Sequence, residues 1–512
     1  MSVQLDATRP APPPPVDAYW DNPVAADPNR LAEPQAPVLA DPSIQPEPQR
    51  AVADDAVAID GGDTNPRQRT QGQTPDGKTI QIDPLHQGAE VSIAREQTLA
   101  DAGLGRTYVS TDQVVLTTGA KNDDVQITQR DDGTLDVGIN GEKYEVRLGE
   151  NQELTIRSGA GNDTINVAPN VKVNIVVDGG AGDDKIATGA GNDRIDGGLG
   201  NDDISTGDGR DDLFGNSGDD RLDAGRGDDV VYGGDGADRL AGGDGVDFLE
   251  GGKGNDTLEG GAGKDMLSGG LDDDTLRGGE GDDAVYTGAG KDTVDNQSGA
   301  DTVYAQTASD LINAATGAKN TVINVEISAS KGVSIEGSEA FKQRVGAEID
   351  FLRASPNGQQ MLAQFDQAAA RGNSVTIKEL SNEQNGYAQT FSNDADIVNG
   401  KPGKGGDVQI SYNPSFHMAE FPAPVVVLYH EMSHAYNGVT GTFQPGTYRG
   451  TGPDNGQVPN AERQAVGLET SAPGYDFDGD PSTPKTTANP DHLTENGLRG
   501  ELGLPDRPSY SL

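Results

Sequence analysis

Two histidines four residues apart bracket a glutamate in the stretch VVVLYHEMSHAYNG, residues 425–438. On a helix, positions i and i+4 share a face, so His430 and His434 would project together and could hold one Zn²⁺ through their imidazoles. Glu431 would lie beside the open coordination position, where it could take a proton from the attacking water. The alternative is a structural pair of histidines that binds no metal. The helical context, directly after an apolar run, favours zinc.

The third zinc ligand must come from another segment. The extended motif His-Glu-x-x-His-x-x-Gly-x-x-His would require Gly at 437 and His at 440, whereas this chain has Asn437 and Thr440. The next helical pattern, NAERQAVGLE at residues 460–469, offers Glu462 and Glu469 on roughly one face. We predict Glu462 as the ligand and keep Glu469 as the alternative. An ordinary first-turn helix glutamate is the competing interpretation of Glu462.

Two further features are consistent with a peptidase. Tyr448, between the two helical patterns, could stabilise an oxyanion through its hydroxyl, although a packed loop tyrosine explains it as well, and Tyr436 has a weaker claim. The stretch DVQISYNP, residues 407–414, could be an edge strand against which an extended peptide pairs. We expect His417 and His492 at the surface and not among the ligands.

Aspartates recur at a period of nine residues through the middle of the chain. Two residues after each stands an aliphatic residue, and two residues before each stands Gly, with Asp272 as the exception. Units such as GGKGNDTLE, residues 251–259, fit the nonapeptide G-G-x-G-x-D-x-U-x, and an out-of-phase unit carries Asp163. The fourteen in-phase aspartates are Asp184, Asp193, Asp202, Asp211, Asp220, Asp229, Asp238, Asp247, Asp256, Asp265, Asp274, Asp283, Asp292 and Asp301.

This repeat predicts a parallel β-roll in which two units form one coil and the aliphatic residues point inward. The aspartates and turn carbonyls would form cages of oxygen atoms, which suit Ca²⁺. The alternative is a glycine-rich solenoid that binds no metal. Residues 180–304 strongly resemble the calcium-binding repeats of hemolysin-type (RTX) bacterial proteins. That resemblance implies calcium at the aspartates from Asp184 to Asp292.

A second resemblance concerns residues 400–510. The stretches LYHEMSHAYNG, NAERQAVGLE and LTENGLRGELGLPDRPSY resemble the M91 family of zinc metallopeptidases, which includes type III-secreted effectors. The resemblance implies zinc at His430 and His434, catalysis by Glu431 and, less directly, a third ligand at Glu462. Kinase-cleaving members of that family lack a calcium-repeat module, so their substrate does not transfer to this chain.

The sequence divides into four predicted regions. We expect a disordered, proline-rich arm at residues 1–105, because twelve of the 30 prolines lie in the first 50 residues. Residues 106–178 alternate apolar and polar positions, which predicts a β-rich segment, and residues 179–305 form the calcium-binding roll. Residues 320–512 mix helix and strand patterns, including a helix with Ser338 as its N-cap, and predict an α+β, zincin-like domain.

Composition limits the partners. The formal net charge of −45 argues against nucleic acid and anionic membranes, and the absence of cysteine excludes disulfides and thiolate metal sites. No apolar run approaches the ~20 residues that span a membrane, and the polar N-terminus does not resemble a Sec signal peptide. We expect a monomer that binds Zn²⁺ and Ca²⁺ and acts on a protein or peptide substrate from a host.

The function predicted from these features is that of a bacterial zinc endopeptidase, secreted or translocated into a host cell, with a calcium-stabilised β-roll. The rival hypothesis is a calcium-dependent structural or adhesive protein with a vestigial peptidase domain. The intact triplet of His430, Glu431 and His434 counts against the rival. Calcium repeats favour type I export and the proline-rich arm favours type III export, so the sequence leaves the route open.

Overall fold

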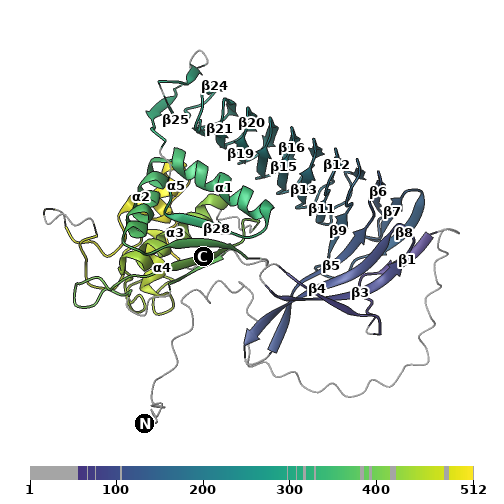
Figure 1. Ribbon diagram of the computed structural model, residues 1–512, viewed down its shortest axis with the longest axis horizontal. Helices are drawn as coiled ribbons and strands as arrows, with labels where there is room; N and C mark the ends of the chain where they lie inside the picture. Colours follow the sequence, from purple (N-terminus) through teal and green to yellow (C-terminus); the bar gives the residue numbers. More distant parts are fainter. Residues whose placement is uncertain are drawn as a thin grey trace, which may run out of the picture. The chain divides into compact units, whose positions relative to one another are not determined.

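The computed structural model describes residues 56–510 apart from 66, 75–76, 104–105, 297, 307, 315–318, 328–329, 381–385, 391–394, 416–422, 478–481 and 483. Within these residues the chain forms a two-sheet β-roll over residues 56–324 and an α+β domain over residues 333–510 (Figure 1). The predicted fold class, a parallel β-roll followed by an α+β domain, is confirmed. His417 and the proline-rich residues 1–55 lie outside the described residues.

The chain alternates between the two sheets of the roll, so strands 18 residues apart are neighbours. Leu213 pairs with Val231 in one sheet, and Leu222 pairs with Leu240 in the other, always in parallel. Two nonapeptides therefore make one coil, as the period predicts. Figure 1 shows the resulting row of short strands.

Sheet A contains, in spatial order, β1 (Ala56–Asp60), β8 (Glu142–Arg147), β7 (Leu135–Ile139), β6 (Asp124–Gln129), β10 (Thr164–Val167), β12 (Lys185–Ala187), β14 (Asp203–Ser205), β16 (Arg221–Arg226), β18 (Arg239–Asp244), β20 (Thr257–Ala262), β22 (Thr275–Glu280), β24 (Thr293–Asn296) and β26 (Leu311–Ala314). Sheet B contains β2 (Thr70–Gln73), β3 (Thr79–Gln87), β4 (Ser92–Gly103), β5 (Arg106–Thr117), β9 (Glu153–Arg157), β11 (Ile175–Asp178), β13 (Arg194–Leu199), β15 (Asp212–Ser217), β17 (Val230–Asp235), β19 (Phe248–Lys253), β21 (Met266–Leu271), β23 (Ala284–Tyr286), β25 (Thr302–Ala305) and β27 (Thr321–Asn324).

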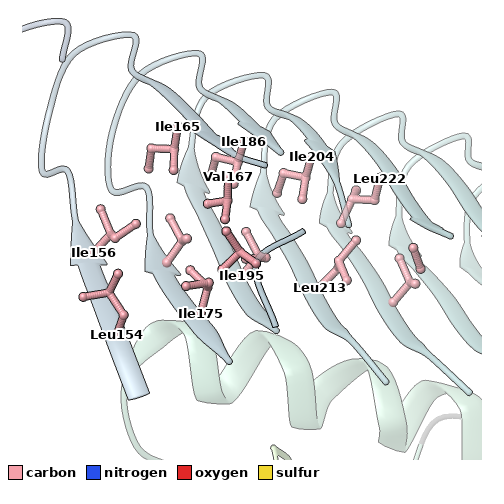
Figure 2. Packing of buried hydrophobic residues seen from close by; sticks show 14 of the residues in the cluster. Leu154, Ile156, Ile165, Val167, Ile175, Ile186, Ile195, Ile204, Leu213 and Leu222 are labelled. Atoms are coloured by element: carbon pink, nitrogen blue, oxygen red, sulfur yellow. The ribbon is translucent and has the colours of Figure 1, made fainter. Parts of the chain in front are cut away.

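The core of the roll is a double column of aliphatic side chains from the two sheets. Ile186, Ile204 and Leu222 from sheet A face Ile195 and Leu213 from sheet B, and all are buried (Figure 2). The turns between strands need glycine. At Gly227, φ is +153°, and a Cβ would lie 1.5 Å from the carbonyl oxygen of Gly209, so any side chain would collide with the previous coil.

The structure corrects the predicted disordered arm of residues 1–105. From Ala56 onward the chain forms strands: β1 pairs with β8, and β2 to β5 form an antiparallel meander whose last strand pairs with β9. These strands cover the first coil of the roll, and Ile93 is fully buried there. The prediction failed because the apolar runs of β3 and β4 are interrupted by glutamine, aspartate and proline, which weakens their alternation.

The α+β domain builds one mixed sheet with helices packed against it. The sheet order is β28-β29-β31-β30, with β30 antiparallel to β31. The elements are β28 (Val333–Glu336), α1 (Glu339–Ala354), α2 (Pro356–Ala370), β29 (Val375–Glu379), β30 (Gly386–Thr390), β31 (Val408–Tyr412), α3 (Pro424–Thr440), α4 (Asn460–Val466), the 3₁₀ helix η1 (Asp491–Leu493) and α5 (Glu495–Glu501).

Several local predictions for this domain can be compared with the structure. Ser338 caps α1, and its side chain accepts the N–H of Phe341 at 3.2 Å, as predicted. Helix α3 runs to Thr440 and is ended by Gly441, which adopts a left-handed conformation with φ of +72°. The stretch at residues 407–414 is not an edge strand, because β31 lies between β29 and β30.

Among the described helices, none has the length and apolar character needed to cross a membrane.

Candidate metal centres

Helix α3 is the central element of the α+β domain and carries the His-Glu-x-x-His motif. Pro424 stands in its first turn, where a missing N–H costs nothing, and the apolar run that follows packs against β30, β31, α2, α4 and α5. This packing buries the helix from Pro424 to Val439, including His430, Glu431 and His434, which are 1–3% exposed. The two histidines therefore occupy one face of a rigid helix.

Glu462 on α4 completes a compact group with these histidines. Its Oε2 lies 3.0 Å from His434 Nε2 and 3.6 Å from His430 Nε2, and the two Nε2 atoms are 3.2 Å apart. Ligand atoms held tetrahedrally around Zn²⁺ at about 2.0–2.1 Å are about 3.3 Å from one another. The three atoms thus have the mutual spacing of zinc ligands, and the donor set suits zinc.

The electrostatics of this group agree with that chemistry. Burial lowers the pKa of His430, but hydrogen bonds to Glu462 and Glu495 outweigh it and raise the pKa to about 10. Burial raises the pKa of Glu462, yet the two histidines hold it well below its ordinary value. The buried carboxylate of Glu462 faces both imidazoles. A divalent cation held between the three groups would balance the charge of the carboxylate while both imidazoles stayed neutral.

A second set of metal-binding groups runs along the roll. The backbone N–H of Asp184 donates to Asp202 Oδ1 at 2.8 Å, and that of Asp202 donates to Asp220 Oδ1 at 2.8 Å. The same bond continues from coil to coil, and Asp163 joins the ladder through Asp184 Oδ1 at 2.7 Å. The aspartates of the ladder therefore accept the bond between coils through Oδ1.

The second oxygen of these aspartates is buried and has no hydrogen-bond partner among the described residues. This holds for Oδ2 of Asp184, Asp193, Asp202, Asp211, Asp220, Asp229, Asp238, Asp247, Asp256, Asp265, Asp274, Asp283 and Asp292. In one turn, Oδ2 of Asp238 lies 2.5 Å from where a Cβ on Gly233 would stand, so it faces the turn backbone. Burial raises the pKa of Asp202 and Asp220 to about 7. These buried carboxylate oxygens, which have no hydrogen-bond partner among the described residues, are suitable ligands for Ca²⁺, because Ca²⁺ prefers oxygen ligands.

Comparison with known families agrees with both sites. Residues 329–510 match the Peptidase M91 family, described as effector protein. Windows at residues 178–213, 205–240, 214–249, 241–276 and 268–303 match the RTX calcium-binding nonapeptide repeat. The chain carries an M91 peptidase effector domain joined to RTX calcium-binding repeats. A search of curated proteins found no match to the chain. Together the two families indicate a secreted bacterial protein that binds calcium.

The M91 domain contains a contact that the sequence did not reveal. His430 Nδ1 lies 3.0 Å from Oε2 of Glu495, the first residue of α5, and Glu495 is fully buried. Arg507 and Arg499 lie 3.2 Å and 3.5 Å from the same carboxylate, and their charge and the bond to His430 keep its pKa low despite burial. Zinc-binding histidines usually have a carboxylate on the other ring nitrogen, but that rule does not identify which of the many acidic residues provides it.

Glu431 has the environment of a buried base. Burial raises its pKa, while the two histidines and the backbone N–H of Ala388 on β30 oppose that shift. Its Oε2 has no hydrogen-bond partner within the described part of the chain. One carboxylate oxygen therefore remains available for a proton.

The other predicted site residues lie elsewhere. Glu469 follows the end of α4 at Gly467 and is exposed, so it is not part of the histidine group; a left-handed glycine ends the helix before it. The guanidinium of Arg463 stacks 3.8 Å over the ring of Tyr448, and no contact links Tyr448 to the histidines in the described structure. Tyr436 is buried on α3, and His492 is half-buried in η1, outside the group.

One tyrosine near the site was not among the predicted residues. The ring of Tyr510 lies 6.3 Å from that of His430, centroid to centroid, and its N–H donates to Asp454 at 3.0 Å. Since Tyr510 stands near the end of the chain, far from the His-Glu-x-x-His motif, spacing could not have identified it.

Proposed function

We propose that this protein is a zinc-dependent endopeptidase whose metal is held by His430, His434 and Glu462. The observation that carries the proposal is the convergence of three buried ligand atoms, from two helices, at the mutual spacing of zinc ligands. The match to the M91 peptidase family supports the same conclusion. Zinc bound there would supply a Lewis acid for a peptide carbonyl and would lower the pKa of a water molecule.

The residues around the proposed zinc site have different roles in the reaction. Glu431 accepts a proton from the attacking water and returns it to the leaving amine, because its free oxygen lies beside the ligand group. Glu495 holds the imidazole of His430 through Nδ1, so that Nε2 stays turned toward Glu462 and His434. Tyr448 and Tyr510 are the two candidate oxyanion donors, and the ring of Tyr510 is close to that of His430.

We propose β30 as the strand that binds the substrate backbone. It is one of the two edges of the sheet and runs antiparallel to β31, so among the described residues one of its sides is open to an added strand. The backbone N–H of Ala388 on this strand acts on Glu431, so a peptide paired with β30 would pass the catalytic carboxylate. An extended, unstructured segment of a protein is the substrate this arrangement suits.

We further propose that the protein acts as a monomeric effector on a host protein after secretion or translocation. The RTX repeats and the effector family support secretion. The apolar outer face of the roll packs against the chain's own M91 domain, so it requires no second subunit.

The decisive experiment compares zinc content and peptidase rate in a set of variants. Glu431→Gln should retain zinc and lose about 10²–10⁴-fold in rate, since it removes only the proton acceptor. His434→Ala and Glu462→Ala should lose both zinc and activity. Zinc is measured by atomic absorption, and the rate is measured on a denatured protein substrate.

Glu469→Ala is the matched control, because this residue was the alternative ligand and is exposed. It should bind zinc and cleave like the wild type. Normal zinc binding and activity in Glu462→Ala would show that the third ligand is wrong. Full activity in Glu431→Gln would show that the mechanism is wrong.

A further inference from the structure

The outer surface of sheet B differs from that of an ordinary soluble sheet. The residue after each inward aliphatic points outward, and in sheet B these positions form a column with an 18-residue spacing. Its members are all buried: Phe214, Tyr232, Glu250, Ser268, Tyr286 and Tyr304. We call this set the docking column.

Helix α1 of the M91 domain covers one half of the docking column. The guanidinium of Arg344 lies 3.7 Å over the ring of Phe214 and forms a buried ion pair of 3.1 Å with Asp212. Glu348 accepts the hydroxyl of Tyr232 at 3.0 Å. These contacts involve charged groups that are buried on both sides, so they require the roll to be folded.

Helix α5 contacts the other half of the docking column. Tyr286 and Tyr304 stack with ring centroids 4.4 Å apart, and both hydroxyls reach Glu501. The hydroxyl of Tyr286 donates to the Glu501 carboxylate at 3.1 Å, and that of Tyr304 donates to the Glu501 backbone carbonyl at 3.0 Å. The last residue of α5 is therefore held by the roll.

The first residue of the same short helix is Glu495, which bonds His430 Nδ1 at 3.0 Å. One helix of seven residues, from Glu495 to Glu501, therefore connects the roll to a predicted zinc ligand. A second bond steadies this helix, because Asn357 donates to the carbonyl of Gly497 at 2.8 Å while its own N–H donates to Glu501 at 2.9 Å. A displacement of Glu501 would thus be transmitted to the carboxylate that orients His430.

The position of the two tyrosines depends on the calcium cages. Tyr286 lies between the ladder aspartates Asp283 and Asp292, each of which has a buried, unpartnered Oδ2 among the described residues. Desolvated carboxylates without a cation oppose folding of that coil. Calcium bound at these aspartates would therefore stabilise the coils that present the stacked pair of Tyr286 and Tyr304.

We propose that the docking column couples the two metals: calcium in the roll raises the zinc affinity of the M91 domain by holding α5, and hence Glu495, in place. Linkage makes the effect reciprocal, so zinc also raises the calcium affinity. Glu501 and Glu495 are positioning residues in this scheme. The inference rests on the proposed zinc site, and its experiment separates the two.

The test uses the full chain, freed of metals in denaturant and refolded in resin-treated buffer with or without saturating calcium. Zinc affinity is measured by competition with a chromophoric chelator that binds zinc but not calcium. We expect calcium to lower the zinc Kd by about 5–150-fold, the usual range of such couplings. An equal zinc Kd in both conditions would overturn the inference alone, whereas no zinc binding even in saturating calcium would overturn the proposed function.

The route through α5 is tested by removing hydroxyls while keeping the rings. The double variant Tyr286→Phe/Tyr304→Phe removes both hydrogen bonds from the roll to Glu501. In saturating calcium its zinc Kd should rise by about tenfold, toward the calcium-free value. Tyr232→Phe is the matched control, since it removes a hydroxyl of the same column that bonds α1 and not α5. An equal loss in both variants, or none in the double variant, would overturn the α5 route.

Discussion

The two outer faces of the β-roll are built from the same nonapeptide but have opposite properties. In strands β17 to β23 of sheet B the residue before the inward aliphatic is buried, whereas in strands β16 to β22 of sheet A it is exposed. The sheet B residues are Val230, Phe248, Met266 and Ala284, and their counterparts in sheet A are Arg221, Arg239, Thr257 and Thr275. Because both series share one repeat, the calcium-binding and core positions do not determine the difference.

This comparison shows how a repeat acquires a partner surface. The unit constrains the glycines, the aspartate and the aliphatic, whereas the positions that flank the aliphatic remain free to vary. In sheet A they carry exposed pairs such as Arg221 with Asp203 at 3.3 Å. In sheet B, Asp212 forms its pair with Arg344 of the M91 domain at 3.1 Å, where both side chains are buried. One face is solvated and the other is part of the core of the next domain.

Removal of calcium should have the largest effect on stability, because it should unfold the roll and so remove both of its outer faces. In calcium-free buffer the buried, unpartnered Oδ2 atoms of the ladder repel one another, so the roll should lose most of its β circular dichroism. Adding Ca²⁺ should restore the signal, and Mg²⁺ should not, because its octahedral geometry suits this cage poorly. An unchanged spectrum without calcium would contradict the assignment of the ladder as a calcium site.

Much of this organisation could be predicted from the sequence. The nine-residue period determines the coil, and the i, i+4 spacing of His430 and His434 places both on one helix face. Glu462 is the predicted third ligand, and the structure brings it to the histidines while leaving Glu469 outside. These features depend on local geometry, which the sequence encodes directly.

What the sequence did not reveal depends on contacts between distant segments. Glu495 reaches His430 across 65 residues, and Tyr232 reaches Glu348 across 116 residues. A signal for the second contact was present, because aromatic residues stand 18 residues apart at Phe214 and Tyr232, and again at Tyr286 and Tyr304, on alternate units only. Periodicity could therefore have indicated that one face of the roll is covered, but not which helix covers it.

Removing the buried ion pair between Asp212 and Arg344 should reduce stability by less than calcium removal does, but by more than removing an exposed pair of sheet A. Asp212→Asn removes the charge that faces Arg344 and leaves a buried guanidinium without its counterion, which typically costs about 3–5 kcal/mol. Asp203→Asn is the matched change on sheet A, where the pair is exposed and contributes about 0–1 kcal/mol. Denaturant midpoints in saturating calcium provide the measurement, and equal shifts for both variants would contradict the docked face.

The smallest expected effect concerns a carboxyl in the docking column and depends on pH. Glu250 is fully buried, and burial raises its pKa well above the ordinary value of 4.5. Above pH 4.5 the unfolded chain releases this proton while the folded chain keeps it, so the contribution of Glu250 to stability falls as pH rises. In Glu250→Gln the side chain has no proton to release, so the stability of the variant should not fall for this reason. The variant should match the wild type near pH 5 and become the more stable of the two by pH 8.

The matched control is Glu259→Gln, at the equivalent outward position of sheet A, where the side chain is exposed. Because this glutamate stays in water in both states, the substitution should leave stability unchanged at every pH. Unfolding midpoints of the three proteins at pH 5, 6, 7 and 8, with calcium saturating, would measure the difference. If the stability gained in Glu250→Gln does not vary with pH, the gain comes from the shape of the side chain and not from its ionisation, which would contradict the prediction. A similar gain in both variants would mean that the faces do not differ in their exposure to solvent.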